Sequence, residues 1–449
     1  MAIRRILIAN RGEIAVRIIR TCRKLNIQTV LAASEADRDS LPARLADRTV
    51  CIGPARPTDS YLKVETIVHA ARGTDSDAIH PGYGFLSERA ALARLCESEG
   101  VVFIGPTAAQ IDAVGDKLRA RSEAVAAEVP VVPGGAVTSI EEALRLARSI
   151  GAPFLVKAVG GGGGRGMKRV DRIEDLPAAM ELASAEAGAA FGDARVYLER
   201  YIASGRHVEV QVLGDGKGCV IHLGERDCSV QRRYQKLVEE TPAPDLTDTL
   251  RSSLHEAAVR FVQRLSYRGA GTVEFLVDRE REAFYFLEMN ARIQVEHPVT
   301  EAVTGIDLVA EQIAIAEGQG LRLAQADVRR RGCAIECRVN AEDPAHDFRP
   351  SPGLVREVSW PGGEGIRVDT HIVSGSRIPP FYDSLMAKII AHADDRPAAL
   401  ARLQRAVAAT RLDGVATNLA FQAVVLSHPE FQVGGVDTGF LAREVLRHG

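Results

Sequence analysis

The sequence predicts an α/β domain with a doubly wound parallel sheet, followed by α+β units that contain antiparallel sheets. Three observations support this fold class. The first hundred residues alternate short apolar runs with segments of helical period, a glycine run lies between two strand-like segments, and a long hairpin pattern precedes strand-rich sequence. Strands that alternate with helices predict a parallel sheet, whereas hairpins build antiparallel sheets.

The first domain is expected over residues 1–115. Its pattern predicts strands at 6–9, 29–33, 77–79 and 101–104, and helices at 13–25 and 90–96. In the first helix Ile14, Ile18 and Cys22 share one face, as the helical period requires. The turn NRGEI after the first strand lacks the glycine spacing of a dinucleotide fingerprint, so a Rossmann cofactor site is disfavoured.

A small mobile unit is expected over residues 130–203. The pattern predicts helices at 139–148 and 175–190 and strands at 154–159, 166–170 and 196–199, with Pro/Gly-rich hinges on both sides. The glycine run at 160–166 joins two strands, whereas a P-loop leads into a helix. We interpret it as a flap whose backbone N–H groups fold over phosphate oxygens beside Lys157; the alternative is a plain linker.

The remaining chain is divided into units at 204–330 and 331–449. It begins with a strand at 207–213, includes a hairpin near 272–290, and continues through strand-rich sequence at 333–373 into a helix at 398–410. The segment MAKI at 386–389 is expected to be a core strand, because it lacks the surroundings of a biotin attachment site.

Composition excludes several functional classes. The 449 residues include 56 Lys+Arg and 59 Asp+Glu, so the net charge of −3 argues against nucleic acid or an anionic membrane as partner. The longest uncharged stretch, 414–429, is too short and polar to cross a bilayer, and the N-terminus has no signal-peptide layout. A cytoplasmic protein is expected, with its seven scattered cysteines reduced.

The hairpin GTVEFLVDREREAFYFLEMN places acidic side chains together. With its turn near Arg281, Glu274 lies opposite Glu288, and Asn290 follows on the same face together with apolar Leu276, Phe284 and Phe286. Opposed like charges are destabilising, so a hard divalent cation with oxygen ligands is expected between them. The alternative is a register slip that turns one glutamate to solvent.

The next segment, ARIQVEHPVTE, carries polar groups at period two. If the chain stays extended, Arg292, Gln294 and Glu296 share one face, where the guanidinium suits a planar oxyanion and the carboxylate can accept a proton. The alternative is an ordinary Arg292–Glu296 pair that caps a turn. His297, which precedes a proline, is interpreted as structural.

Seven motifs, taken together, resemble the ATP-grasp ligases and, within them, the biotin carboxylase family. They extend in the family's order along nearly the whole chain: RRILIANRGEIAVRIIR, AIHPGYGFLSE, GDK, KAVGGGGGRGM, GERDCSVQRR, EMNARIQVEHPVTE and AIECRVNAEDP. The resemblance implies an ATP-grasp fold with an N-terminal α/β domain, a mobile lid with the glycine loop, and a C-terminal antiparallel-sheet domain with the metal site.

The resemblance also implies roles for individual residues. Those assigned to ATP are Lys117, Lys157, Gly163, Gly164, Glu199, Arg200, Tyr201, Ile202, His207, Gln231 and Tyr234. Those assigned to Mg²⁺ or Mn²⁺ are Glu274, Glu288 and Asn290, and those assigned to bicarbonate are Lys236, Arg292, Gln294, the Val295 backbone and Glu296. Arg338 is assigned to biotin, and Glu296, Arg292, Arg338 and Lys236 form the implied catalytic set.

The implied reaction is the ATP-dependent carboxylation of biotin through carboxyphosphate, with Glu296 as general base. The implied partners are a biotin carboxyl carrier protein and the carboxyltransferase subunits of an acetyl-CoA or related carboxylase, and a homodimer is expected. Tyr234 departs from the family pattern, in which a histidine is usual. The alternatives are another ATP-grasp ligase and a non-catalytic ATP-binding subunit.

Overall fold

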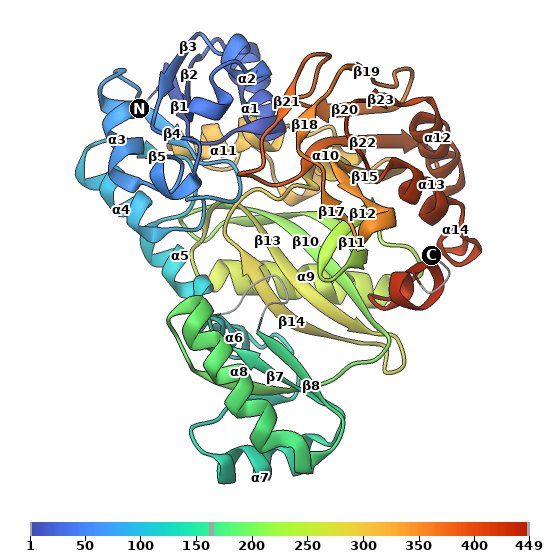
Figure 1. Ribbon diagram of the computed structural model, residues 1–449. Helices are drawn as coiled ribbons and strands as arrows, with labels where there is room; N and C mark the ends of the chain where they lie inside the picture. Colours follow the sequence, from blue (N-terminus) through green and yellow to red (C-terminus); the bar gives the residue numbers. More distant parts are fainter. Residues whose placement is uncertain (1, 161–165, 447–449) are drawn as a thin grey trace.

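The computed structural model describes residues 2–160 and 166–446, which form three sheet-based parts (Figure 1). A five-stranded parallel sheet opens the chain, with strand order β3-β2-β1-β4-β5. Its strands are β1 (Arg5–Ile8), β2 (Gln28–Ala33), β3 (Arg48–Cys51), β4 (Ala78–His80) and β5 (Val102–Phe103). The predicted parallel sheet is therefore confirmed, with β3 as a strand that the apolar pattern did not indicate.

Helices cover both faces of this sheet because successive side chains of a strand point to opposite sides. Leu7 of β1 packs in one core with α3 (Val64–Arg72) and α4 (Ala90–Ser98). Ile6 and Ile8 pack in another core with α1 (Gly12–Lys24) and α11 (Leu308–Ala316). The helices of this part are α1 (Gly12–Lys24), α2 (Leu41–Leu45), α3 (Val64–Arg72), α4 (Ala90–Ser98), α5 (Ala108–Gly115) and α6 (Lys117–Ala126).

The second part, called the lid below, is a small unit that projects from the lower end of the molecule in Figure 1. Its antiparallel sheet has the order β6-β9-β7-β8 and is covered by two helices. The elements are β6 (Gly134–Ala136), α7 (Ile140–Ile150), β7 (Phe154–Ala158), β8 (Met167–Val170), α8 (Leu176–Phe191) and β9 (Val196–Arg200). The Pro/Gly-rich segment expected as a hinge contributes the edge strand β6.

An eight-stranded sheet forms the third part, with the order β14-β13-β10-β11-β12-β15-β22-β20. Its strands are β10 (Gly205–Asp215), β11 (Val220–Arg232), β12 (Gln235–Thr241), β13 (Arg268–Asp278), β14 (Ala283–Asn290), β15 (Cys333–Asn340), β20 (Ile366–Thr370) and β22 (Leu385–Ala393). Its pairings are antiparallel, and β12 pairs with β15, so the segments expected as units 204–330 and 331–449 share one sheet. The MAKI segment lies in β22, as a buried strand.

Helices pack on this sheet, and most of the short strands lie between β15 and β22 in the chain. The helices are α9 (Asp248–Arg264), α10 (His297–Thr304), α11 (Leu308–Ala316), α12 (Arg396–Ala409), α13 (Leu419–Ser427) and α14 (Pro429–Val433). The short strands are β16 (Glu342–Asp343), β17 (Arg349–Pro350), β18 (Gly353–Leu354), β19 (Glu357–Ser359), β21 (Arg377–Ile378) and β23 (Arg411–Asp413). Within residues 2–160 and 166–446, no helix combines the length and apolar character needed to cross a bilayer.

The stability of the protein is expected to depend strongly on the contact between α9 and the large sheet. Phe261 is fully buried and its ring lies 4.8 Å from that of Phe286 on β14. We expect Phe261→Ala to lower the free energy of unfolding by about 3–5 kcal/mol, because it leaves a cavity in close-packed surroundings. Chemical denaturation measures this; Leu182→Ala, at a half-exposed site on α8, is the control, and an equal loss in both variants would contradict the packing argument.

Candidate active site

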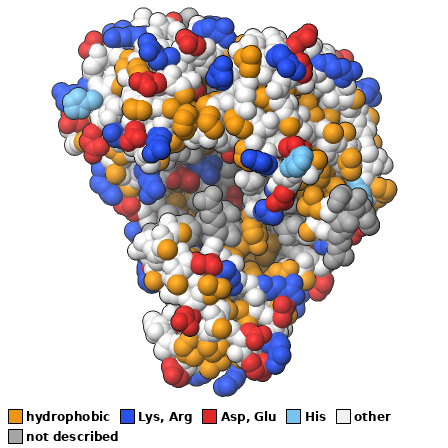
Figure 2. All heavy atoms as spheres, viewed as in Figure 1, with side chains coloured by type: hydrophobic (Ala, Val, Ile, Leu, Met, Phe, Trp, Pro, Cys, Tyr) orange, Lys and Arg blue, Asp and Glu red, His pale blue; other side chains and the backbone are white. Residues whose placement is uncertain are grey.

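The three parts enclose a cleft of about 1000 Å³. Figure 2 shows the hollow between the lid and the broad upper body. The predicted site residues that line it are Lys117, Tyr234, Lys236, Glu274, Glu288, Asn290, Arg292, Gln294, Val295, Glu296 and Arg338. The sequence motifs from α6, the large sheet and the start of α10 therefore meet in one space.

The hairpin of β13 and β14 has the expected register at the glutamates. Glu274 pairs directly with Glu288, and the turn occupies the residues around Arg281. A bulge then shifts the pairing so that Phe275 is opposite Phe286. Phe284 and Phe286 consequently lie in the core with Phe275 rather than beside the glutamates, which corrects the sequence expectation. An extra residue in one strand reverses which side chains face which side.

Both glutamates of this pair, Glu274 and Glu288, contact a lysine ammonium group. Lys117 Nζ lies 2.7 Å from Glu288 Oε2, and Lys236 Nζ lies 2.9 Å from Glu274 Oε1. His207 Nε2 is 2.9 Å from the other oxygen of Glu274. The two lysines supply positive charge that the sequence argument assigned to a metal ion alone.

The donor set nevertheless fits a hard divalent cation. Glu274, Glu288 and Asn290 offer carboxylate and amide oxygens from adjacent strands, the ligand type that Mg²⁺ prefers. The side chain of Glu288 is 34% exposed and faces the cleft, so it has room for a further ligand contact. Asn290 is fixed by donating to Glu274 Oε1 at 2.8 Å while it accepts from Arg292 at 2.8 Å.

Lys236 is the centre of a buried acidic cluster. Its ammonium lies 2.7 Å from Glu209, 2.9 Å from Glu274 and 2.7 Å from Glu296. Burial disfavours the ammonium charge, but the three carboxylates outweigh this and hold the pKa of Lys236 well above its usual range. Lys236 therefore carries a positive charge at the cleft wall.

Glu296 lies between two cations. Lys236 contacts its Oε1, and Arg338 Nη2 lies 3.0 Å from its Oε2. Burial alone would raise the pKa of Glu296, but Lys236, Arg338 and Arg226 outweigh it and hold the pKa below its usual value. Glu296 is therefore ionised at neutral pH and able to accept a proton.

The segment that carries Arg292, Gln294 and Glu296 does not continue as a strand. β14 ends at Asn290, the chain bends, and Glu296 is the N-cap of α10. The bend nevertheless brings the side chains together, because Arg292 donates to Gln294 Oε1 at 2.9 Å and Gln294 donates to Glu274 at 2.9 Å. The expected period-two extension was wrong, because the chain bends and turns over residues 291–296 and α10 begins at His297, with Pro298 in its first turn.

The proposed turn-capping pair between Arg292 and Glu296 does not form either. The partner of Arg292 is Glu88, at 2.9 Å, from the motif AIHPGYGFLSE. His297 is fully buried and its Nδ1 is 2.7 Å from the Gln294 carbonyl, which agrees with a structural role.

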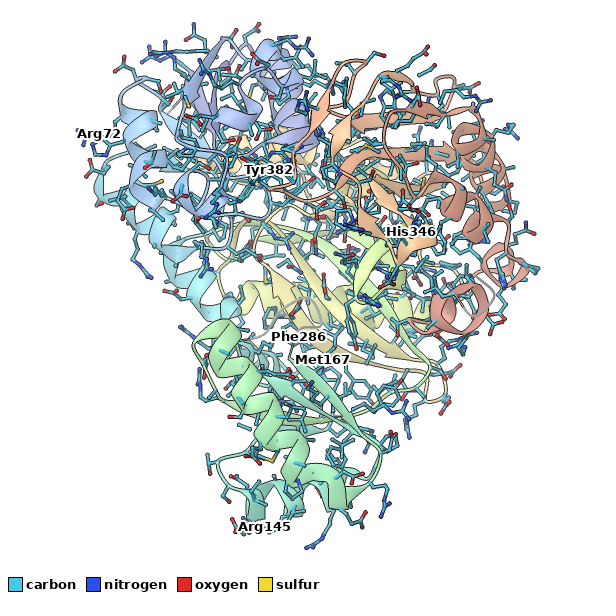
Figure 3. The ribbon with its side chains drawn as sticks, in the orientation of Figure 1. Arg72, Arg145, Met167, Phe286, His346 and Tyr382 are labelled. Carbon is cyan, nitrogen blue, oxygen red and sulfur yellow. The ribbon has the colours of Figure 1, made fainter. Side chains whose placement is uncertain are left out.

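Of the predicted nucleotide residues on the lid, those that the structure describes are not among the residues that line the cleft. Lys157 on β7 pairs with Glu199 on β9 at 2.5 Å. Strand β9 ends at Arg200; beyond it the Tyr201 ring lies 4.5 Å from the Arg169 guanidinium, and Ile202 is buried. Gly163 and Gly164 fall outside the described residues. The predicted hairpin around the glycine run is confirmed at its base, where Lys157 pairs with Met167, which Figure 3 labels.

His207 on β10 and Gln231 on β11 are not among the residues that line the cleft. Gln231 Nε2 is 3.5 Å from His207 Nδ1, and His207 contacts Glu274. Tyr234 is 56% exposed in the turn between β11 and β12, where it has a left-handed backbone conformation.

Several site residues were not singled out in the sequence. Glu88 and Arg226 lie inside quoted motifs, and Glu209 follows His207 by two residues on one strand face, so period-two alternation could have found it. Glu239, which binds Arg338 Nε at 2.6 Å, carries no local signal because its partner is 99 residues away.

The mouth of the cleft joins the first domain to the C-terminal region through Tyr382 (Figure 3). Its hydroxyl lies 2.5 Å from Ser34 Oγ and donates to the Ala55 carbonyl at 2.5 Å, and the Arg11 guanidinium lies 4.1 Å from its ring centroid. These contacts fix the position of the cleft's upper edge.

The chain matches known protein families along most of its length. Three family models match: "Biotin carboxylase, N-terminal domain" at residues 2–111, "Carbamoyl-phosphate synthase L chain, ATP binding domain" at 116–324, and "Biotin carboxylase C-terminal domain" at 336–443. The chain is 50% identical to biotin carboxylase of Nostoc sp., over 97% of this chain and 98% of that protein. It is also 50% identical to biotin carboxylase 1 of Bacillus subtilis, over 98% of each chain.

Solved structures agree with the sequence comparison. The biotin carboxylase of Campylobacter jejuni, described as a β-γ-ATP complex, has a TM-score of 0.96 and 44% identity over 99% of both chains. The biotin carboxylase domain of Hydrogenobacter thermophilus 2-oxoglutarate carboxylase, described as a dimer with MgADP, ADP and bicarbonate, has a TM-score of 0.95 and 45% identity over 98% of both chains. The fold is thus that of the ATP-grasp ligases, and this chain belongs to the biotin carboxylase family.

Proposed function

We propose that this protein uses ATP and bicarbonate to carboxylate biotin held on a carrier protein. The observation that carries the proposal is the position of Glu296, ionised between Lys236 and Arg338 at the wall of the cleft. A base flanked by two cations suits a reaction in which bicarbonate loses a proton and the deprotonated ureido group of biotin is stabilised.

Bicarbonate is placed against Lys236, Arg292, Gln294 and the Val295 backbone. Glu296 removes its proton, and the anion then attacks the γ-phosphate of ATP, which forms a C–O–P bond and releases ADP. The carboxyphosphate breaks down to carbon dioxide and phosphate, and the phosphate takes the ureido proton of biotin. The deprotonated ureido nitrogen then forms the new C–N bond with the carbon dioxide. Because carboxyphosphate is lost to water, the cleft has to exclude solvent during these steps.

Arg338 is placed at the oxygen of the deprotonated ureido group. Its guanidinium is oriented by Glu239 and Glu296, at 2.6 and 3.0 Å, on the wall that Tyr83 also lines. A fixed donor near a developing oxyanion lowers the barrier without reorganisation. The transfer of carbon dioxide to biotin is therefore assigned to the end of the cleft that Arg338 lines.

The nucleotide is assigned to the space between the lid and the large sheet. Lys117 and Lys157 supply charge for the phosphates, Gly163 and Gly164 cover them, and the segment from Glu199 through Arg200 and Tyr201 to Ile202 holds adenine. His207, Gln231 and Tyr234 are assigned to the ribose side. Glu274, Glu288 and Asn290 would hold Mg²⁺ or Mn²⁺, which when bound neutralises phosphate charge.

The partners follow from the chemistry. Biotin has to arrive on a biotin carboxyl carrier protein, and carboxyltransferase subunits have to accept the carboxyl group, as in an acetyl-CoA or related carboxylase. A homodimer is proposed by analogy with the dimeric relative of Hydrogenobacter thermophilus. The domain limits 1–115, 130–203, 204–330 and 331–449, the mobility of the lid and a cytoplasmic location remain predictions.

The test of this function is an ATP-cleavage assay with free biotin. ADP release is expected to need bicarbonate and to rise when biotin is added. If the folded protein binds ATP but neither addition stimulates cleavage, the proposal is wrong, and the alternatives of another ATP-grasp ligase or a non-catalytic subunit take its place.

Tyr234 gives a narrower prediction about nucleotide affinity. We expect Tyr234→His to change the KM for ATP while kcat stays nearly constant, because the residue lines the cleft and is not one of those assigned to bicarbonate or biotin. Steady-state kinetics at saturating bicarbonate and biotin measure both constants. An unchanged KM would contradict the role of this position in nucleotide binding.

A further inference from the structure

Two buried glutamates, Glu239 and Glu336, lie directly opposite each other on the neighbouring strands β12 and β15. Neither side chain has exposed surface. Opposite residues of antiparallel strands share one face of the sheet, with Cβ atoms about 5 Å apart. Arg338 follows Glu336 by two residues on β15, so it points to the same face.

The hydrogen bonds of this pair are incomplete. Glu239 Oε1 accepts from Arg338 Nε at 2.6 Å. Glu239 Oε2 and both carboxylate oxygens of Glu336 have no hydrogen-bond partner within residues 2–160 and 166–446. Two ionised carboxylates side by side, one of them without a donor, would carry a large desolvation and repulsion cost. One proton on Glu336 removes both costs, because its O–H can donate to the free oxygen of Glu239.

The surrounding charges do not offer Glu336 another partner. Lys388 on β22 lies 3.0 Å from Glu13 of α1 and donates to the Val295 carbonyl at 2.6 Å, and its strand neighbour on β20 is Asp369. Glu296 and His297, at the start of α10, are engaged by Lys236, Arg338 and the Gln294 carbonyl. The cations near Glu336 are therefore already paired with other oxygens.

We propose that Glu336 carries a proton that it donates to Glu239, and that it is thereby a positioning residue for Arg338. The donated hydrogen bond favours the ionised form of Glu239 and fixes the carboxylate that binds the guanidinium. The kinetic consequence rests on the proposed function, in which Arg338 stabilises the oxyanion of biotin. Glu336 itself contacts no substrate.

The direction of the pKa shifts agrees with this arrangement. Burial raises the pKa of Glu336 well above its usual range; the charge of Lys388 opposes the increase, and the charge of Glu239 adds to it. Burial also raises the pKa of Glu239, to about 7, although Arg338 opposes the increase. Burial and the charge of Glu239 thus favour a proton on Glu336, and Glu239 gains a proton, and loses its ionic contact with Arg338, as the pH falls through about 7.

Two variants separate the effect of losing the hydrogen-bond donor at position 336 from the effect of changing the shape of the side chain. Glu336→Gln keeps a donor for Glu239, so the KM for biotin is expected to stay near the wild-type value. Glu336→Met fills a similar volume without a donor, so the KM for biotin is expected to rise about tenfold, the effect of losing a hydrogen bond to a charged group. Cleavage of ATP with bicarbonate but without biotin is expected to stay unchanged in both.

The pH dependence of the KM for biotin is a second measurement, and a purely structural role of Glu336 would not change it. In the wild type and in Glu336→Gln the KM for biotin is expected to rise as the pH falls below about 7. In Glu336→Met this rise is expected to begin at higher pH, because Glu239 has lost the donor that favours its ionised form. Equal profiles and equal KM values for the two variants would overturn the proposal.

Infrared spectroscopy tests the proton without any enzymatic activity. The difference spectrum between the wild type and Glu336→Gln at pH 8 is expected to contain the carbonyl band of a protonated carboxylic acid, present only in the wild type. Absence of that band would overturn the proposal even in an active enzyme. An inactive wild-type protein that shows the band would instead contradict the proposed function alone.

Discussion

Glu296→Gln is expected to lower kcat for biotin-dependent ATP cleavage by about 100-fold to 10,000-fold, the range of a lost general base. The amide cannot accept the bicarbonate proton, although it preserves the size of the side chain. The substitution also removes the negative charge that lies 2.7 Å from Lys236 and 3.0 Å from Arg338. Initial rates of ADP release with saturating ATP, bicarbonate and biotin measure the effect.

The matched control for this variant is Glu311→Gln. Glu311 is also buried and also pairs with an arginine, Arg322 at 2.5 Å, but it lies on α11 away from the residues that line the cleft. We expect the control to keep wild-type kcat. A Glu296→Gln enzyme that is folded and retains more than a tenth of wild-type kcat would contradict the assignment of Glu296 as the base.

Arg338→Lys is expected to lower the biotin-stimulated rate by about 100-fold, the scale of removing one donor to a developing oxyanion. The guanidinium offers several donors in one plane, and two carboxylates already bind it at 2.6 and 3.0 Å. A lysine ammonium keeps the charge but cannot span both carboxylates and the substrate oxygen together. ATP cleavage with bicarbonate alone is expected to stay nearly unchanged, so assays with and without biotin separate the two stages.

Arg356→Lys provides the control for Arg338→Lys. Arg356 also pairs with a carboxylate, Asp413 at 2.8 Å, but it is exposed, in the segment between the short strands β18 and β19. Its replacement is expected to leave both rates unchanged. If Arg338→Lys lowered the two rates equally, Arg338 would act on bicarbonate or on folding rather than on biotin.

The fold was predictable where local patterns decide it. Alternation of apolar runs with helical segments indicated the parallel sheet, and the register of Glu274 with Glu288 followed from the length of the hairpin. The bulge that moved Phe286 into the core was not predictable, because it depends on packing against Phe261, a residue of a distant helix. Strand β6 was missed because Gly134 and Gly135 carry no side chains that reveal a strand.

The candidate site was predictable as a set of residues but not as a set of contacts. Arg292 and Glu296 were expected to be neighbours, yet Arg292 pairs with Glu88 and Glu296 with Lys236, which lie far away in the chain. Such partners are chosen by the three-dimensional arrangement of the sheets, and only the motifs that contain them were visible in the sequence. The same holds for the buried Glu239, whose contact with Arg338 crosses from β12 to β15.

The central claim is that ATP activates bicarbonate as carboxyphosphate before biotin is carboxylated, and heavy-oxygen-labelled bicarbonate tests it most directly. Attack of a bicarbonate oxygen on the γ-phosphate, followed by breakdown to carbon dioxide, leaves that oxygen in the phosphate. The account predicts one labelled oxygen in the phosphate released for each carboxybiotin formed, as mass spectrometry would show. Unlabelled phosphate in an enzyme that cleaves ATP would mean that water is the nucleophile, and would contradict the account.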